Sequence, residues 1–144
     1  METSIYDLAG GMPAFETLVE AFYVGIETDE LLRPMYPEEL TAAKRRLTLF
    51  LCQYFGGPET YSQERGHPRL RMRHAAFVVD ENARDHWIEH MLAAMNQSAI
   101  PEPAKSAMVD YFVSTANFLV NVPRQVIPAA TYLKLEDREK RDGE

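Results

Sequence analysis

Apolar side chains return every three or four residues along two stretches in the first half of the chain, which is the spacing of one face of an α-helix. The first stretch covers residues 13–26, and Pro13 suits the first turn of a helix, where its missing N–H costs little. The second covers residues 40–54 and is expected to stop at the Gly-Gly-Pro of residues 56–58. The pattern therefore predicts two amphipathic helices.

The second half of the chain shows the same spacing twice. Asp80 is placed to cap a helix, because its carboxylate can accept a hydrogen bond from the N–H groups of the first turn. The inner face of that helix carries Trp87, Ile88, Met91, Ala94 and Met95. The Pro-Glu-Pro of residues 101–103 separates it from a last helix, whose apolar face runs from Met108 to Val120 and which ends before Pro123.

The segments between these stretches show neither the alternation typical of strands nor an internal repeat. Residues 58–67 are interpreted as a loop because they lack periodicity. The chain has 144 residues, the size of one domain with a single core. Nearly all of its last nine residues are charged. The sequence predicts an all-α domain over residues 1–123 and a solvated tail over residues 124–144.

Composition and charge exclude several classes of function. The net charge of −7 argues against a general binder of nucleic acid or of anionic membranes. No apolar run approaches the ~20 residues of a membrane span, and the first residues lack the basic start and apolar core of an export signal. The single cysteine, Cys52, lies in an apolar run and is interpreted as a buried hydrophobe. We expect a cytoplasmic protein, since no disulfide can form within the chain.

Two of the four histidines belong to the sequence HWIEH at residues 86–90, which matches a zinc-peptidase pattern. In that hypothesis His86 and His90 bind zinc and Glu89 activates water. On a helical wheel, however, both histidines lie toward the outer side of the apolar face. We therefore favour two ordinary histidines on a solvent-facing flank and keep the zinc peptidase as an alternative.

Residues 65–74, RGHPRLRMRH, concentrate four arginines and two histidines in an acidic protein. In a helix, His74 would project beside Leu70 and Arg71, with Phe77 just beyond. That arrangement suits a neutral imidazole under a flat apolar ligand with anionic groups at its edge. Haem is such a ligand, because its iron takes an axial imidazole and its two carboxylates pair well with arginine. A solvated basic loop with a structural histidine is the alternative, and composition alone favours it.

Three further side chains combine an apolar body with one polar hydrogen atom, namely Tyr23, Tyr36 and Trp87. If they are buried together, their donors need an acceptor. A diatomic ligand on iron, carrying partial negative charge, would supply one. Taken singly, each such residue is more often part of an ordinary core than of a cofactor pocket.

At this point the sequence resembles a group II truncated haemoglobin, a short globin with a two-over-two helical sandwich. The similarity runs from about residue 4 to residue 122. It is carried by IYDLAGG (5–11), FY (22–23), LLRPMYPEE (31–39), RRLTLFLCQYFGGPETYSQERGHPRLRMRH (45–74) and the tryptophan at 87.

The resemblance implies a haem b cofactor and a role for each matching residue. It implies His74 as the ligand of the iron. The side of the haem that holds the diatomic ligand would be faced by Tyr23, Tyr36 and Trp87, with Ala43 where many globins place a histidine. The haem itself would be bound by Arg46, Tyr61 and Arg71 at its propionates and by Leu47, Phe50, Leu70 and Phe77 on its faces.

The function implied is the binding of O₂ and other diatomic ligands with slow release. The same pocket would also suit a haem enzyme, with peroxidase-like or nitric-oxide-detoxifying activity, that needs an electron-donating reductase. The resemblance further implies a tendency to form homo-oligomers.

Overall fold

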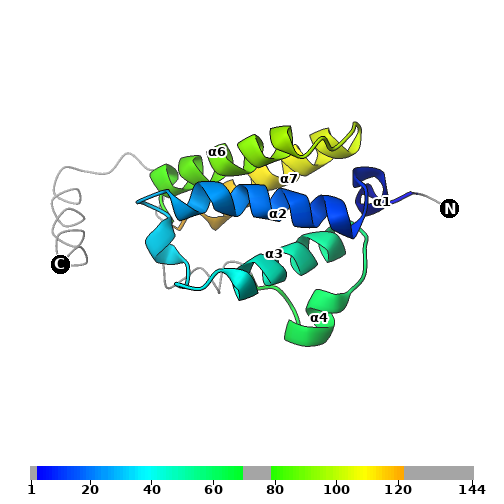
Figure 1. Cartoon of the computed structure of the whole chain (residues 1–144), viewed down its shortest axis with the longest axis horizontal. Helices are drawn as coiled ribbons and strands as arrows, with labels where there is room; N and C mark the ends of the chain where they lie inside the picture. The colour runs from blue at the N-terminus through cyan, green and yellow to red at the C-terminus, as the bar shows by residue number, and fades with distance from the viewer. Residues whose placement is uncertain (1–2, 70–78, 122–144) are drawn as a thin grey trace, which may run out of the picture.

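The computed structural model describes residues 3–69 and 79–121, and every regular element within these ranges is a helix (Figure 1). The predicted all-α class is therefore confirmed. The elements are α1 (Ile5–Ala9), α2 (Met12–Glu27), the 3₁₀-helix η1 (Arg33–Met35), α3 (Thr41–Tyr54), α4 (Thr60–Arg65), α6 (Glu81–Gln97) and α7 (Ala104–Leu119).

The four long helices form two packed pairs, α2 with α3 and α6 with α7. Helix α2 packs against both α3 and α6, and α6 packs against α7 (Figure 1). The short α1 lies against α7 and α2 at one end of the molecule. This is the predicted two-over-two arrangement, and the pairs enclose a core in which Phe15, Phe22, Ile26, Met91 and Phe112 are almost completely buried.

Local signals set the helix ends where the sequence predicts them. Pro13 lies in the first turn of α2. The Asp80 side chain accepts a hydrogen bond of 2.8 Å from the Ala83 N–H, and so caps α6. Helix α3 ends at Tyr54, two residues before Gly56, whose φ of 102° favours glycine.

The prediction of a loop over residues 58–67 is wrong, because α4 lies within it. A helix of six residues is too short to show periodicity, and side chains from α3 hold it in place. The Gln53 side chain donates to Ser62 Oγ at 2.6 Å and accepts from the Ser62 N–H at 2.9 Å. Arg45 forms two charged hydrogen bonds with Glu64, of 2.6 and 2.7 Å. These contacts join positions far apart in sequence, so no local pattern could reveal them.

Cys52 is 1% exposed. Burial raises the pKa of its thiol to about 11, and the charge of Glu16 acts in the same direction. The interpretation of Cys52 as an inert hydrophobe is confirmed. Among residues 3–69 and 79–121, no helix has both the length and the apolar character needed to cross a membrane. The predicted tail over residues 124–144 lies outside the described residues.

Candidate functional site

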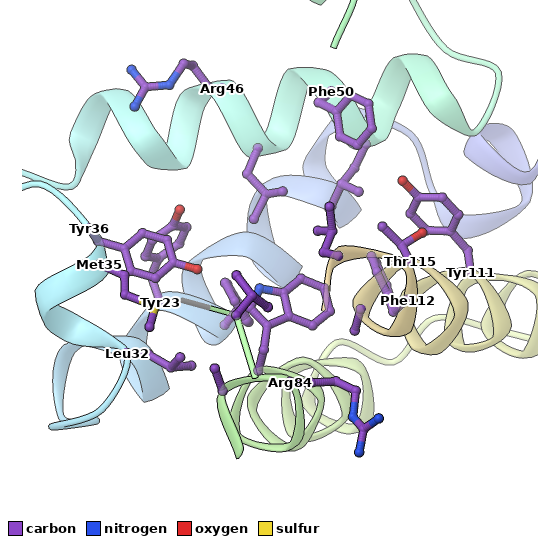
Figure 2. Close-up of a pocket in the computed structure, with 18 of the residues that line it drawn as sticks. Tyr23, Leu32, Met35, Tyr36, Arg46, Phe50, Arg84, Tyr111, Phe112 and Thr115 are labelled. Carbon is purple, nitrogen blue, oxygen red and sulfur yellow. The ribbon is translucent and has the colours of Figure 1, made fainter. Parts of the chain in front are cut away.

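A cavity of about 290 Å³ lies between the two helix pairs, close to η1. Figure 2 shows Tyr23 and Tyr36 side by side at one end of it, with Tyr111, Phe112 and Thr115 of α7 at the other end and Phe50 of α3 above. Most of the lining is apolar, and the few polar groups gather at particular places. A cavity of this kind takes a largely apolar ligand that is oriented by a small number of polar contacts.

The three predicted hydrogen-bond donors all line this cavity. The rings of Tyr23 and Tyr36 meet edge to face with centroids 5.6 Å apart. Trp87 reaches the cavity from α6 and packs edge to face on Phe22, at 5.3 Å. Residues from α2, the end of η1 and α6 are thus brought together as the sequence predicts.

Both phenols keep their protons at neutral pH. Burial raises the pKa of Tyr23 to about 12, although the Arg46 guanidinium acts to lower it. Burial also raises the pKa of Tyr36 well above its usual range. The electrostatic effect of Tyr23 raises this pKa further, whereas a hydrogen bond with the Trp87 indole lowers it. Tyr23 and Tyr36 therefore remain O–H donors, and the Trp87 N–H can only donate.

The α3 side of the cavity contains three more predicted residues, since Arg46, Leu47 and Phe50 all line it. Tyr61 of α4 lines it too, 5% exposed, and packs edge to face on Phe50 at 5.5 Å. Ala43 is buried on the same helix but is not part of the lining. Its predicted role beside the ligand stays a prediction.

Four predicted residues, Leu70, Arg71, His74 and Phe77, lie outside the described residues. The described residues on either side of them reach the cavity, because Tyr61 lines it before this segment and Val79 lines it after. Val79 forms two hydrogen bonds with Asn121, which lies just after the end of α7. Its N–H donates to Asn121 Oδ1 at 2.9 Å, and its carbonyl accepts from the Asn121 N–H at 2.8 Å.

Sequence reasoning missed much of the lining. The additional residues are Phe22, Leu32, Met35, Leu51, Val79, Ala83, Arg84, Tyr111, Phe112, Thr115, Ala116 and Leu119. Most of them lie on apolar helix faces that the sequence does predict. Periodicity identifies the buried face of a helix, but it does not distinguish a residue that touches another helix from one that faces a cavity.

The prediction of a solvent-facing flank holds only in part for His86 and His90, whose side chains are 38% and 22% exposed, because both rings also contact the turn after α2. His86 Nδ1 lies 2.9 Å and His90 Nε2 lies 2.6 Å from the same oxygen, Asp29 Oδ2. The Asp29 side chain is only 6% exposed. An ionised carboxylate only accepts, so both ring nitrogens donate to it. Asp29 is far from the histidines in sequence, which is why the wheel could not place them.

The carboxylate of Asp29 is held in its ionised form. Burial would raise the pKa of Asp29, but hydrogen bonds from His90 and His86 and from the amides of Leu32 and Leu31 outweigh burial and hold the pKa well below its usual range. A group whose pKa is lower in the folded state stabilises the fold above its unfolded pKa. It loses that contribution as the pH falls toward the folded pKa.

Asp29→Asn is therefore expected to lower the free energy of unfolding by about 1–3 kcal/mol at pH 7. The difference from the parent protein should shrink as the pH falls below 3.8, the ordinary value for the side chain. Urea unfolding followed by circular dichroism, at pH 7 and at pH 3, measures it. Glu20→Gln, which removes an exposed carboxylate paired with Lys44, should cost much less. A pH-independent loss in Asp29→Asn would contradict the prediction.

The zinc-peptidase alternative receives no support from the side chains described. Within residues 3–69 and 79–121, no three or more His, Cys, Asp or Glu side chains are grouped so that they could hold a metal ion. Glu89, the proposed base, is exposed to solvent. The two histidines donate to a carboxylate that is already fully engaged.

Comparison with known proteins shows which family the chain belongs to. A family model for bacterial-like globins matches residues 4–121. The group 2 truncated hemoglobin YjbI of Bacillus subtilis (strain 168) is 34% identical over 111 residues, which cover 77% of this chain and 84% of that protein. The chain belongs to the group II truncated haemoglobins.

Solved structures of truncated haemoglobins and related hemoglobins share the fold. The hemoglobin of the thermophilic phototrophic bacterium Chloroflexus aurantiacus is 50% identical with a TM-score of 0.82, covering 83% of this chain and 99% of that one. The truncated oxygen-avid haemoglobin of Bacillus subtilis is 33% identical with a TM-score of 0.79, covering 83% of this chain and 100% of that one. The predicted globin fold is confirmed.

The cofactor of this truncated haemoglobin is haem b, the cofactor of the globin family. The cavity lining fits that group in its chemistry. Apolar side chains such as Leu47, Phe50 and Phe112 suit the faces of a macrocycle. Arg46 supplies a partly exposed cation for a carboxylate at the edge. The donors of Tyr36 and Trp87 suit a small polar ligand.

Proposed function

We propose that this truncated haemoglobin binds O₂ and related diatomic ligands at its haem and releases them slowly. The observation that carries the proposal is the gathering of three hydrogen-bond donors, Tyr23, Tyr36 and Trp87, in one otherwise apolar cavity. An apolar surrounding strengthens each hydrogen bond, because water does not compete for the donor.

When bound, haem would supply an iron that binds a diatomic ligand. His74 is the proposed protein ligand, and Arg46, Arg71 and Tyr61 are the proposed partners of the propionates. Leu70, Phe77, Leu47 and Phe50 would pack on the faces of the macrocycle, with Ala43 leaving room on the ligand side. Val79, directly after the segment that contains His74, lines the cavity, as does Tyr61 of α4 before it, which supports this arrangement.

The donors favour retention of the ligand over rapid exchange. A hydrogen bond to a charged or partly charged acceptor contributes about 1.5–3 kcal/mol. Two such bonds slow escape by about a hundredfold or more, since about 1.4 kcal/mol is tenfold. A relative in the same family, the Bacillus subtilis protein, is described as oxygen-avid, in agreement with slow release from this protein.

The same donors suit a second function. They can stabilise negative charge that develops on a reacting peroxide or on a ligand attacked by nitric oxide. Such an enzyme would need a reductase to return the iron to its ferrous state. Turnover with peroxide far above that of free haem would favour it, and turnover equal to free haem would leave the binding function. For either function we propose a cytoplasmic location, consistent with the single reduced cysteine.

His74→Gly is expected to abolish or greatly weaken haem binding, because it removes the side chain proposed to hold the iron. Absorption spectra of the ferric, the reduced and the carbon-monoxide-treated protein measure this. The parent protein should show one haem per chain and a shift with carbon monoxide. His67→Gly is the matched control, since His67 lies outside the cavity lining, and it should keep the parent spectrum. A His74→Gly spectrum identical to that of the parent would contradict the assignment of His74.

A further inference from the structure

A single buried carboxylate joins the two parts of the chain that carry two of the cavity donors, Tyr36 and Trp87. Asp29 lies in the turn between α2 and η1, and both of its oxygens are used. Its Oδ1 accepts from the N–H groups of Leu31 and Leu32, at 2.9 and 3.1 Å. Its Oδ2 accepts from His86 and His90 of α6. We call these three side chains, Asp29, His86 and His90, the Asp29 clamp.

The clamp depends on a close approach between α2 and α6. Gly25 of α2 faces the His90 ring, and a Cβ at that position would collide with it. His90 can reach Asp29 in this geometry because residue 25 has no side chain. The two helices are therefore fitted to each other where the clamp forms.

Both ends of the clamp lie close in sequence to a cavity donor, Asp29 to Tyr36 and the two histidines to Trp87. The turn that Asp29 caps continues into Leu32, Met35 and Tyr36, which all line the cavity. On α6, Trp87 follows His86 and stands one turn before His90. Tyr36 and Trp87 belong to segments far apart along the chain, so their relative position depends on contacts between the two segments.

A second observation links the clamp to the donors. The pKa of Tyr36 is raised chiefly by burial, and the negative charge of Asp29 acts in the same direction. The Asp29 carboxylate therefore lies close enough to Tyr36 for its charge to act on the phenol.

We propose that the Asp29 clamp positions Tyr36 and Trp87 toward the diatomic ligand and thereby controls how long the ligand is held. This inference rests on the proposed function. Asp29, His86 and His90 touch no ligand themselves, so they act as positioning residues through Tyr36 and Trp87.

Asp29→Asn is the sharpest single change. Its remaining oxygen can still accept from Leu31 and Leu32, whereas its NH₂ group cannot accept from the histidines. In the haem-bound protein we expect O₂ to dissociate about three- to tenfold faster, since part of one ligand hydrogen bond is lost. The carbon–oxygen stretching frequency of the carbon monoxide complex should move toward that of Trp87→Phe. His90→Gln and His86→Gln each break one bond of the clamp and should show smaller changes in the same direction.

Glu20→Gln serves as the matched control. It breaks the ion pair of 3.2 Å between Glu20 and Lys44, which joins α2 to α3 without reaching the cavity lining. Its O₂ dissociation rate and its stretching frequency should equal those of the parent protein.

A double variant separates positioning from general stability. If the clamp acts through Trp87, adding Asp29→Asn to Trp87→Phe should speed dissociation much less than it does in the parent background. A rate and a stretching frequency unchanged in Asp29→Asn and in both histidine variants, with only stability lowered, would overturn the inference. So would full additivity of Asp29→Asn with Trp87→Phe and also with Tyr36→Phe. If Trp87→Phe and Tyr36→Phe themselves leave the rate unchanged, the proposed function fails first. If Trp87→Phe and Tyr36→Phe change the O₂ dissociation rate but the clamp variants do not, only the positioning role of the clamp is contradicted.

Discussion

Replacing Trp87 or Tyr36 with phenylalanine is expected to speed the release of O₂ by about ten- to a hundredfold in each case. Each change deletes one donor and leaves a ring of similar shape in the cavity. The loss of a hydrogen bond to a partly charged ligand costs about 1.5–3 kcal/mol, and about 1.4 kcal/mol corresponds to a tenfold rate. Stopped-flow displacement of O₂ by carbon monoxide measures the dissociation rate directly.

The control for this prediction is Tyr6→Phe. Tyr6 is a tyrosine outside the cavity lining, stacked on Phe15 with ring centroids 5.7 Å apart. It loses the same hydroxyl without touching the ligand, so its rate should equal that of the parent protein. If both cavity variants also keep the parent rate, Tyr36 and Trp87 do not bond the ligand and the assignment of the cavity fails. A change in only one of them would identify the single donor that holds it.

The helices were predictable because their signals are local. The spacing of apolar residues placed all four long helices, and Pro13 and Asp80 marked two of their starts. The sequence did not predict helix α4, because side chains of another helix, Gln53 and Arg45 of α3, hold it in place. A short segment held by tertiary contacts carries little pattern of its own.

The site was predictable only in part, for a related reason. Side-chain chemistry and the resemblance to a family together pointed to Tyr23, Tyr36 and Trp87, which the structure brings to one cavity. It did not supply the α7 wall or Asp29. A cavity exists where packing leaves space, and a clamp exists where two distant segments meet. The spacing of residues along one helix predicts neither a cavity nor a contact between distant segments.

Phe112→Ala is expected to lower the free energy of unfolding more than Asp29→Asn does. Phe112 is 1% exposed, and its ring contacts Trp87 at 6.0 Å, Tyr111 at 5.7 Å and Phe55 at 6.3 Å, measured between centroids. Truncating a buried phenylalanine costs about 3–5 kcal/mol, because the lost contacts and the new void both count. Urea unfolding of the haem-bound protein measures the loss, under conditions where haem is in excess.

Phe118→Ala is a control on the same helix with the same change, since Phe118 is 54% exposed. It should cost well under half as much, because an exposed ring gives up little burial. Phe112 also borders the cavity beside Trp87, so its removal should loosen that indole and raise the O₂ dissociation rate, whereas Phe118→Ala should not. Equal losses of stability in the two variants would mean that α7 does not pack on the cavity through Phe112. A large loss of stability without a change in rate would mean that Trp87 is held from the α6 side alone, where the Asp29 clamp lies.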